Sequence, residues 1–187
     1  MTLLLPACNG TDLEKIQYLK VPRITLKPDA HAITVRLKGT PGEISASGFG
    51  ILYKVNYKLD EKYRKKLEAP RARWEALSAN AGKDMTATFA LIVDDFLHEL
   101  PKSVQEEFPD VKLVDWGYGE VGEILHVGPY NAEKSSVEKL SDFIKTNGYT
   151  ISGLHEEEYY KGPGMFFKGN ENNYHTIIRY QVRKQKN

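Results

Sequence analysis

The feature that most constrains this chain is a strand-then-helix pattern that occurs twice along the sequence. A shift of 89 positions aligns the glycine after each strand and the inward positions of each helix: Gly39 with Gly128, Gly48 with Val137, Ile51 with Leu140 and Val55 with Ile144. Each half then runs strand, helix, strand, strand. Two such halves joined edge to edge would create a cleft, which is a natural place for a ligand.

Local patterns predict the individual elements. Helices are expected at 40–59, 101–108 and 131–146, and the first begins with Thr40, Pro41 and Glu43, a favoured helix start. Gly48 weakens that helix but could allow close approach to a sheet. Extended segments are expected at 16–27, 32–37, 86–93, 111–116, 120–127, 150–160 and 175–182.

The segment 60–83 is charged and has no clear period, and Trp74 is its one large apolar residue. We read it as a loop or short helix in which Trp74 covers the edge of a core. The alternative is a flap that lays Trp74 across a pocket mouth.

Length and composition indicate one globular domain of 187 residues. We divide it into a flexible start or residual signal segment at 1–15 and a single domain at 16–187, with half-repeats at about 30–116 and 120–183. The formal net charge is +1, from 26 basic and 25 acidic side chains, so we expect no nucleic-acid partner. We expect no cofactor, and the oligomeric state stays open.

The N-terminal sequence leaves two localisations open. No apolar run is long enough for a transmembrane segment, and the single cysteine, Cys8, excludes an internal disulfide and a cysteine-based zinc site. We expect a cytoplasmic protein. The run from Leu3 to Cys8 resembles the end of a lipoprotein signal, so an exported lipoprotein is the alternative if that signal is truncated.

The segment Leu154 to Tyr159 carries the strongest functional signal. Strand side chains alternate, so His155, Glu157 and Tyr159 share one face, while Glu156 and Glu158 point away. Burial of an acid between aromatic rings is costly unless something offsets its charge. The pattern predicts a pocket for a cationic or protonatable ligand, centred on Glu157. A solvated strand face is the alternative.

Other residues could complete this site. We assign ligand binding to a broader set of aromatic, histidine and arginine side chains: Tyr159, His155, Trp116, Tyr130, His126, Tyr118, Phe167 and Arg179. Ordinary core packing is the alternative for each aromatic residue, and a surface ion pair for Arg179. His126, His155 and Glu157 do not have a recognised metal-ligand spacing, so we expect no metal site.

The chain resembles the GyrI-like family, which includes the effector-binding domain of some bacterial transcription activators. The matching residues are His126-Val127-Gly128-Pro129-Tyr130, Glu133, Asn147-Gly148-Tyr149, His155, Glu157-Glu158-Tyr159 and Thr176-Ile177-Ile178-Arg179. The resemblance implies an α+β fold: a tandem repeat of strand-helix-strand-strand units with a curved antiparallel sheet, helices on one side and a ligand cleft between the halves. It also implies that Glu157 faces the ligand. No DNA-binding region precedes the domain, so we expect a stand-alone member.

Three functions follow from this reading. The first is binding of small cationic or amphipathic aromatic molecules, for sensing or sequestering. The second is hydrolysis of strained electrophiles such as cyclopropane-containing alkylating antibiotics, with Glu157 as base and Tyr159 as oxygen activator. The hydrolase branch of the family usually has His-His-Glu-Ile-Tyr where this chain has His155-Glu156-Glu157-Glu158-Tyr159. The third is a protein–protein inhibitor module, which would need a protein partner.

Overall fold

The computed structural model describes residues 13–64, 68–75, 84–162 and 169–185. The chain divides into two compact units. Unit 1 contains the residues up to Thr25, then Glu120–Gly153 and Glu157–Asn187, and unit 2 contains Leu26–Gly119 and Leu154–Glu156. The predicted start at 1–15 lies mostly outside the described residues.

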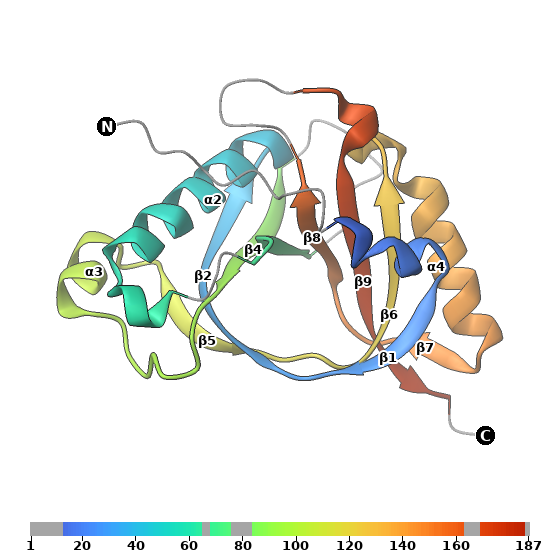
Figure 1. Cartoon of the computed structure of the whole chain (residues 1–187), viewed down its shortest axis with the longest axis horizontal. Coiled ribbons are helices and arrows are strands. Elements are labelled where there is room, and N and C mark those ends of the chain that lie inside the picture. Colours follow the sequence, from blue (N-terminus) through green and yellow to red (C-terminus); the bar gives the residue numbers. More distant parts are fainter. Residues whose placement is uncertain (1–12, 65–67, 76–83, 163–168, 186–187) are drawn as a thin grey trace. The chain divides into compact units, whose positions relative to one another are not determined.

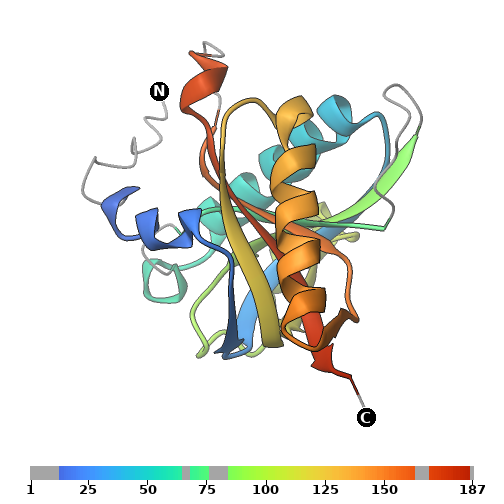
Figure 2. The ribbon, with the colours of Figure 1, turned by 90° about the vertical axis from the view of Figure 1, so that its right-hand side faces the viewer.

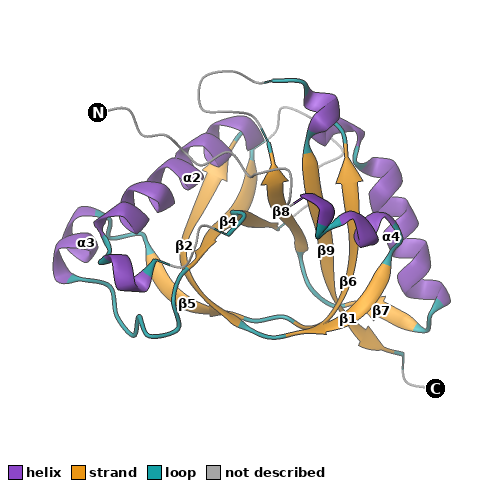
Figure 3. Ribbon diagram, viewed as in Figure 1, coloured by secondary structure: helices purple, strands orange, loops and turns teal. Residues whose placement is uncertain are grey.

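Unit 2 combines one long helix with an antiparallel sheet (Figures 1 and 3). Its strands are β2 (Ala30–Gly39), β3 (Arg71–Trp74), β4 (Met85–Ile92) and β5 (Lys112–Trp116), and their order is β3-β4-β2-β5. Helix α2 (Pro41–Lys58) packs on β2 and β4. A short 3-10 helix (Glu61–Tyr63) and α3 (Lys102–Glu107) lie in the connections.

Unit 1 also joins a helix to an antiparallel sheet. Its strands are β6 (Gly119–Val127), β7 (Tyr149–Ile151), β9 (His175–Lys184) and most of β8 (His155–Lys161), whose first two residues belong to unit 2, and β1 (Arg23–Lys27) likewise has residues in both units. The order is β1-β6-β9-β8, and β7 also pairs with β9. Helix α4 (Lys134–Thr146) runs along β6, as Figure 2 shows. Short 3-10 helices occur at Gln17–Lys20, Tyr130–Ala132 and Glu171–Asn173.

The predicted tandem repeat is confirmed by the strand pairing. In unit 2 the strand before the helix, β2, pairs with β4, and β3 lies on the other side of β4. In unit 1 the equivalent strand, β6, pairs with β9, and β8 lies on the other side of β9. The fold is therefore α+β with antiparallel pairing, built from two copies of one arrangement, and β7 is an addition to the second copy.

Helix α2 begins where the sequence predicts, although its cap differs in detail. Thr40 precedes the helix and Pro41 is its first residue, but the Thr40 hydroxyl donates to the Glu43 carboxylate instead of accepting a backbone N–H. Gly48 faces the sheet, where an added Cβ would lie 2.4 Å from the Phe89 ring. The predicted close approach of this helix to a sheet is confirmed.

Unit 1 has an apolar layer on each face of its sheet. Under α4, the residues Ile124, Leu140, Ile144, Ile178, Tyr180 and Val182 form one buried cluster, and Val137 packs against it. On the other face, Leu125 and Ile177 pack with Ile16 and Leu19. Alternate residues of β9 thus serve opposite faces, as strand geometry requires.

Two segments differ from the sequence predictions. Part of 16–27 forms a 3-10 helix instead of extended chain, and β3 occupies part of the segment read as a charged loop or helix. Trp74 ends β3 with 6% of its surface exposed, and its ring meets that of Phe89 edge-on at 5.9 Å. This position matches the interpretation of Trp74 as core cover. Residues 76–83 lie outside the described residues.

Among the described residues, no helix is both long enough and apolar enough to cross a membrane.

Candidate functional site

Strand β8 carries three consecutive acids, and all three are buried. Glu156, Glu157 and Glu158 expose only 3%, 7% and 7% of their surface, so the solvated strand face considered for this segment is ruled out. Alternation places Glu157 and Tyr159 on one face, and Glu156 and Glu158 on the other. The two faces have different chemistry.

The Glu157 face of β8, within unit 1, is lined with tyrosines. The Tyr130 ring meets the Tyr159 ring edge-on, with 5.7 Å between the centroids. It also lies 5.3 Å from the Tyr174 ring, at an interplanar angle of 38°. Tyr130 begins the 3-10 turn before α4, because Gly128 and Pro129 end β6 at that point. The predicted pair Tyr130 and Tyr159 is therefore brought together, with Tyr174 as a third member.

The charge of Glu157 acts on two tyrosine hydroxyls. Burial raises the pKa of Tyr130 well above its ordinary value, and the neighbouring Glu157 carboxylate raises it further. Burial also raises the pKa of Tyr180, and Glu133 and Glu157 add to this effect. Both hydroxyls therefore stay protonated at neutral pH.

Glu133 is the second acid of this group. A carboxylate oxygen of Glu133 lies within 4.8 Å of one of Glu157. Glu133 lies next to the first residue of α4, in the N-cap position. Two carboxylates at this separation can hold a cation between them, and His155, two positions before Glu157, projects from the same face of β8.

Little in the sequence pattern indicates that Glu133, Tyr174 and Tyr180 are site residues. Glu133 appeared only as a match to the GyrI-like pattern. The alternation of the last strand, with Ile178, Tyr180 and Val182 on one face, was the signal that could have placed Tyr180 on the α4 side.

His126 has both ring nitrogens in hydrogen bonds within unit 1. Nε2 lies 3.1 Å from the Pro129 carbonyl oxygen, and Nδ1 lies 3.0 Å from Ser136 Oγ. A carbonyl oxygen only accepts, so Nε2 donates to Pro129, and Ser136 Oγ is the hydrogen-bond partner of Nδ1. These bonds tie the end of β6 to the first turn of α4, which is a structural task.

Arg179 lies on the opposite face from Glu157, between two acids. Its side chain is 2% exposed, and it donates from Nε to Glu123 at 3.0 Å and from Nη1 to Glu158 at 3.1 Å. Thr25 also donates to Glu123, at 3.4 Å. Arg179, which the sequence analysis assigns to ligand binding, is thus bonded to two buried carboxylates, and Glu158 is held on the face away from Glu157.

Trp116 and Tyr118 belong to a separate cluster in unit 2. Trp116 Nε1 and Arg73 Nε both donate to Glu156 Oε2, at 2.9 and 2.8 Å. Tyr118 accepts at its hydroxyl from Arg71 Nη1 at 2.6 Å. Trp116 therefore bonds Glu156, on the opposite face of β8 from Glu157, whereas Tyr118 bonds Arg71. The other predicted aromatic, Phe167, lies outside the described residues.

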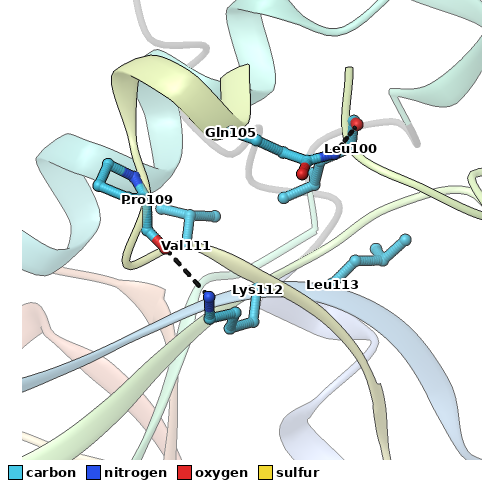
Figure 4. Close-up of a pocket in the computed structure, with 6 residues that line it drawn as sticks. All are labelled: Leu100, Gln105, Pro109, Val111, Lys112 and Leu113. Carbon is cyan, nitrogen blue, oxygen red and sulfur yellow. Dashed lines mark hydrogen bonds between the residues drawn. The ribbon is translucent and has the colours of Figure 1, made fainter. Parts of the chain in front are cut away.

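A cavity of about 310 Å³ in unit 2 contains none of the predicted site residues. It is lined by Leu100, Gln105, Pro109, Val111, Lys112 and Leu113 (Figure 4). Its polar side chains are turned back to the backbone, since Lys112 Nζ donates to the Pro109 carbonyl oxygen and Gln105 Nε2 to that of Leu100. This cavity offers an apolar surface without a charged group directed at a ligand.

Comparisons with known proteins find the fold but no sequence family. No family model matches, and no curated protein matches. A hydrolase from Listeria innocua is similar in structure at 22% identity and a TM-score of 0.72, covering 92% of this chain and 97% of that one. The C-terminal domain of EcmrR is 17% identical with a TM-score of 0.60, covering 88% and 98%. SAV2435, solved bound to tetraphenylphosphonium, is 12% identical with a TM-score of 0.52, covering 87% and 93%. At such identities the likeness shows a common fold, which is consistent with the GyrI-like resemblance.

Proposed function

We propose that this chain binds small cationic or amphipathic aromatic molecules on the Glu157 face of β8, to sense or sequester them. The observation that carries this proposal is the buried carboxylate of Glu157, which projects from the same face of β8 as Tyr159, whose ring meets the Tyr130 ring edge-on at 5.7 Å. A negative group among aromatic rings favours a ligand that combines positive charge with apolar surface.

The aromatic rings and the carboxylates attract a cationic ligand in different ways, and both attractions favour binding. Aromatic faces attract cations by about 0.5–2 kcal/mol each, more strongly where water is excluded. The carboxylates supply the longer-range attraction, which is larger in a partly dry site than in water. In this proposal Glu157 and Glu133 meet the positive charge, and Tyr130, Tyr159 and Tyr174 provide the apolar walls.

Two further considerations support the proposal. The GyrI-like resemblance places the equivalent of Glu157 against the ligand. A structural neighbour, SAV2435, was solved with tetraphenylphosphonium, a large aromatic cation. His155 on the Glu157 face and Phe167 complete the ligand-binding set that we carry forward from the sequence.

Calorimetric titration with tetraphenylphosphonium tests the proposal. We expect saturable binding by the wild type and a loss of at least about tenfold in affinity for Glu157→Gln, because the neutral amide keeps the shape but removes the charge. Glu138→Gln is the matched control, since Glu138 is an exposed acid of α4 in the same unit. Equal affinity of all three proteins would refute the role of Glu157.

A second candidate function is hydrolysis of a strained electrophile on the same face. The pair Glu133 and Glu157, with oxygens within 4.8 Å, favours it, because one carboxylate could take a proton from water while the other acts as an acid. The water oxygen would then bond to one ring carbon as the strained carbon–carbon bond breaks, the acid would give its proton to the electrons that this bond releases, and Tyr159 would act as oxygen activator. A binding protein returns a cyclopropane-containing alkylating compound unchanged, whereas a hydrolase converts many equivalents, and Glu133→Gln would stop that turnover.

A further inference from the structure

Glu156 is fixed by two donors of unit 2. Both Arg73 Nε and Trp116 Nε1 donate to one oxygen, Glu156 Oε2, at 2.8 and 2.9 Å. Hydrogen bonds to a charged acceptor are shorter and stronger than neutral ones, and two that converge on one atom fix its position. Only 3% of the surface of Glu156 is exposed.

The Arg73 guanidinium is itself held on several sides. Its Nη2 donates to the Gly117 carbonyl oxygen at 2.7 Å, and its central carbon lies 3.9 Å from the centre of the Trp116 ring and 5.5 Å from that of Tyr118. A planar guanidinium that is stacked and bonded in this way has one orientation. Backbone and rings thus determine where Arg73 Nε points, and Nε determines where Glu156 lies.

The residue that follows Glu156 along β8 is Glu157. In a strand, the position of one residue fixes the direction of the next side chain, because both share one peptide unit and alternate about it. Arg73 and Trp116 therefore act on the Glu157 carboxylate through the backbone, from the opposite face of the strand.

We propose that Arg73 and Trp116 are positioning residues that aim the Glu157 carboxylate at the positive charge of the ligand, without contact to the ligand themselves. This inference rests on the proposed function. It assigns Trp116 a different task from the ligand wall that the sequence predicts.

The test uses two substitutions and two probes, tetraphenylphosphonium and the neutral triphenylphosphine oxide. Arg73→Lys keeps the positive charge but loses the planar fork, and Trp116→Phe keeps a ring but loses the N–H donor. We expect each variant to bind the cation roughly three- to thirtyfold more weakly, and the neutral probe as tightly as the wild type does. Loosening of the whole site would instead weaken both probes.

Arg36→Lys is the matched control. Arg36 also forms a two-bond pair with an acid of unit 2, Glu75, at 2.7 and 3.0 Å, but its side chain is 64% exposed. We expect this variant to keep the wild-type preference for the cation.

The outcomes separate the inference from the proposed function. If Arg73→Lys and Trp116→Phe keep the wild-type preference while Glu157→Gln loses it, the positioning role is wrong and the proposed function stands. If Glu157→Gln also keeps the preference, both are wrong. Thermal unfolding shows whether Arg73→Lys folds. If it does not fold, the affinities of Trp116→Phe for the two probes decide the question.

Discussion

Arg179 shows how burial determines the role of a charged side chain in this chain. Its guanidinium bonds Glu123 and Glu158, and all three side chains are at most 10% exposed. The sequence left a surface ion pair open for Arg179, and such pairs contribute little. A buried pair behaves differently, because removing one partner leaves uncompensated charge where water cannot reach it.

Replacement of Arg179 by Met should therefore destabilise the protein strongly. We expect a loss of about 3–5 kcal/mol in the free energy of unfolding, since Glu123 and Glu158 would lose a buried counter-charge. Urea unfolding monitored by circular dichroism measures the loss. Arg183→Met serves as control, because Arg183 is exposed in the same strand and should change the stability by less than about 0.5 kcal/mol. A similar effect of both substitutions would contradict this account.

At the scale of elements, α2 owes its distance from the sheet to one glycine. Gly48 is a poor helix residue, yet its missing side chain leaves room for the Phe89 ring. The same helix has a second glycine, Gly50, with no atom near the place that a Cβ would take. The two positions separate helix propensity from packing.

Alanine at these two positions should have opposite effects. Gly48→Ala places a methyl group against Phe89, and we expect the overpacking to cost about 1–3 kcal/mol, more than the gain in propensity. Gly50→Ala should stabilise the protein by about 0.5–1 kcal/mol, because only propensity changes. Differential scanning calorimetry compares the two melting temperatures. A stabilising Gly48→Ala would show that α2 can move away from the sheet at little cost.

A helix or strand can be predicted from sequence when the residues that determine it lie within that element. Helix α2 was predictable because its cap and its apolar spacing are contained in the helix itself. Strand β3 was not, because Arg71 and Arg73 read as solvated charge. Both arginines find partners that are distant in sequence: Tyr118 for Arg71, and Glu156 for Arg73. Such partners permit burial of a charged strand, and no local pattern contains them.

At the scale of the whole molecule, two tyrosines make the free energy of unfolding depend on pH in the alkaline range. The pKa values of Tyr130 and Tyr180 are raised in the folded protein, chiefly by burial. In the unfolded chain both return to about 10. Above that pH the unfolded state binds fewer protons than the folded state, so the free energy of unfolding falls as pH rises. Below pH 10 these two groups do not make stability depend on pH.

Urea unfolding at pH 8.5 and pH 10.8 measures this dependence. We expect the wild type to lose more stability between the two pH values than the double variant Tyr130→Phe, Tyr180→Phe, because phenylalanine has no proton to release. Lysines titrate in both proteins, so the difference between them isolates the two tyrosines. Equal losses would mean that neither hydroxyl is shielded as described.

The candidate site was predictable only in part. Strand alternation correctly placed Glu157 and Tyr159 on one face and away from Glu156 and Glu158. Alternation could not show that Glu133, at the start of α4, would approach Glu157. Nor could it show that Glu157 would raise the pKa of Tyr180. These residues come from three separate elements, and only the folded chain brings them together. The hydrogen bond from Trp116 to Glu156 likewise joins residues that are distant in sequence, so alternation could not predict it.

The central claim is that the charge of Glu157 selects cationic ligands. The most direct test is a cycle of four affinities, in which wild type and Glu157→Gln are each titrated with tetraphenylphosphonium and with triphenylphosphine oxide. We predict that the wild type prefers the cation and that Glu157→Gln loses about tenfold or more of this preference, while the affinity for the neutral probe is unchanged. An equal preference in both proteins would contradict the claim, whatever the absolute affinities.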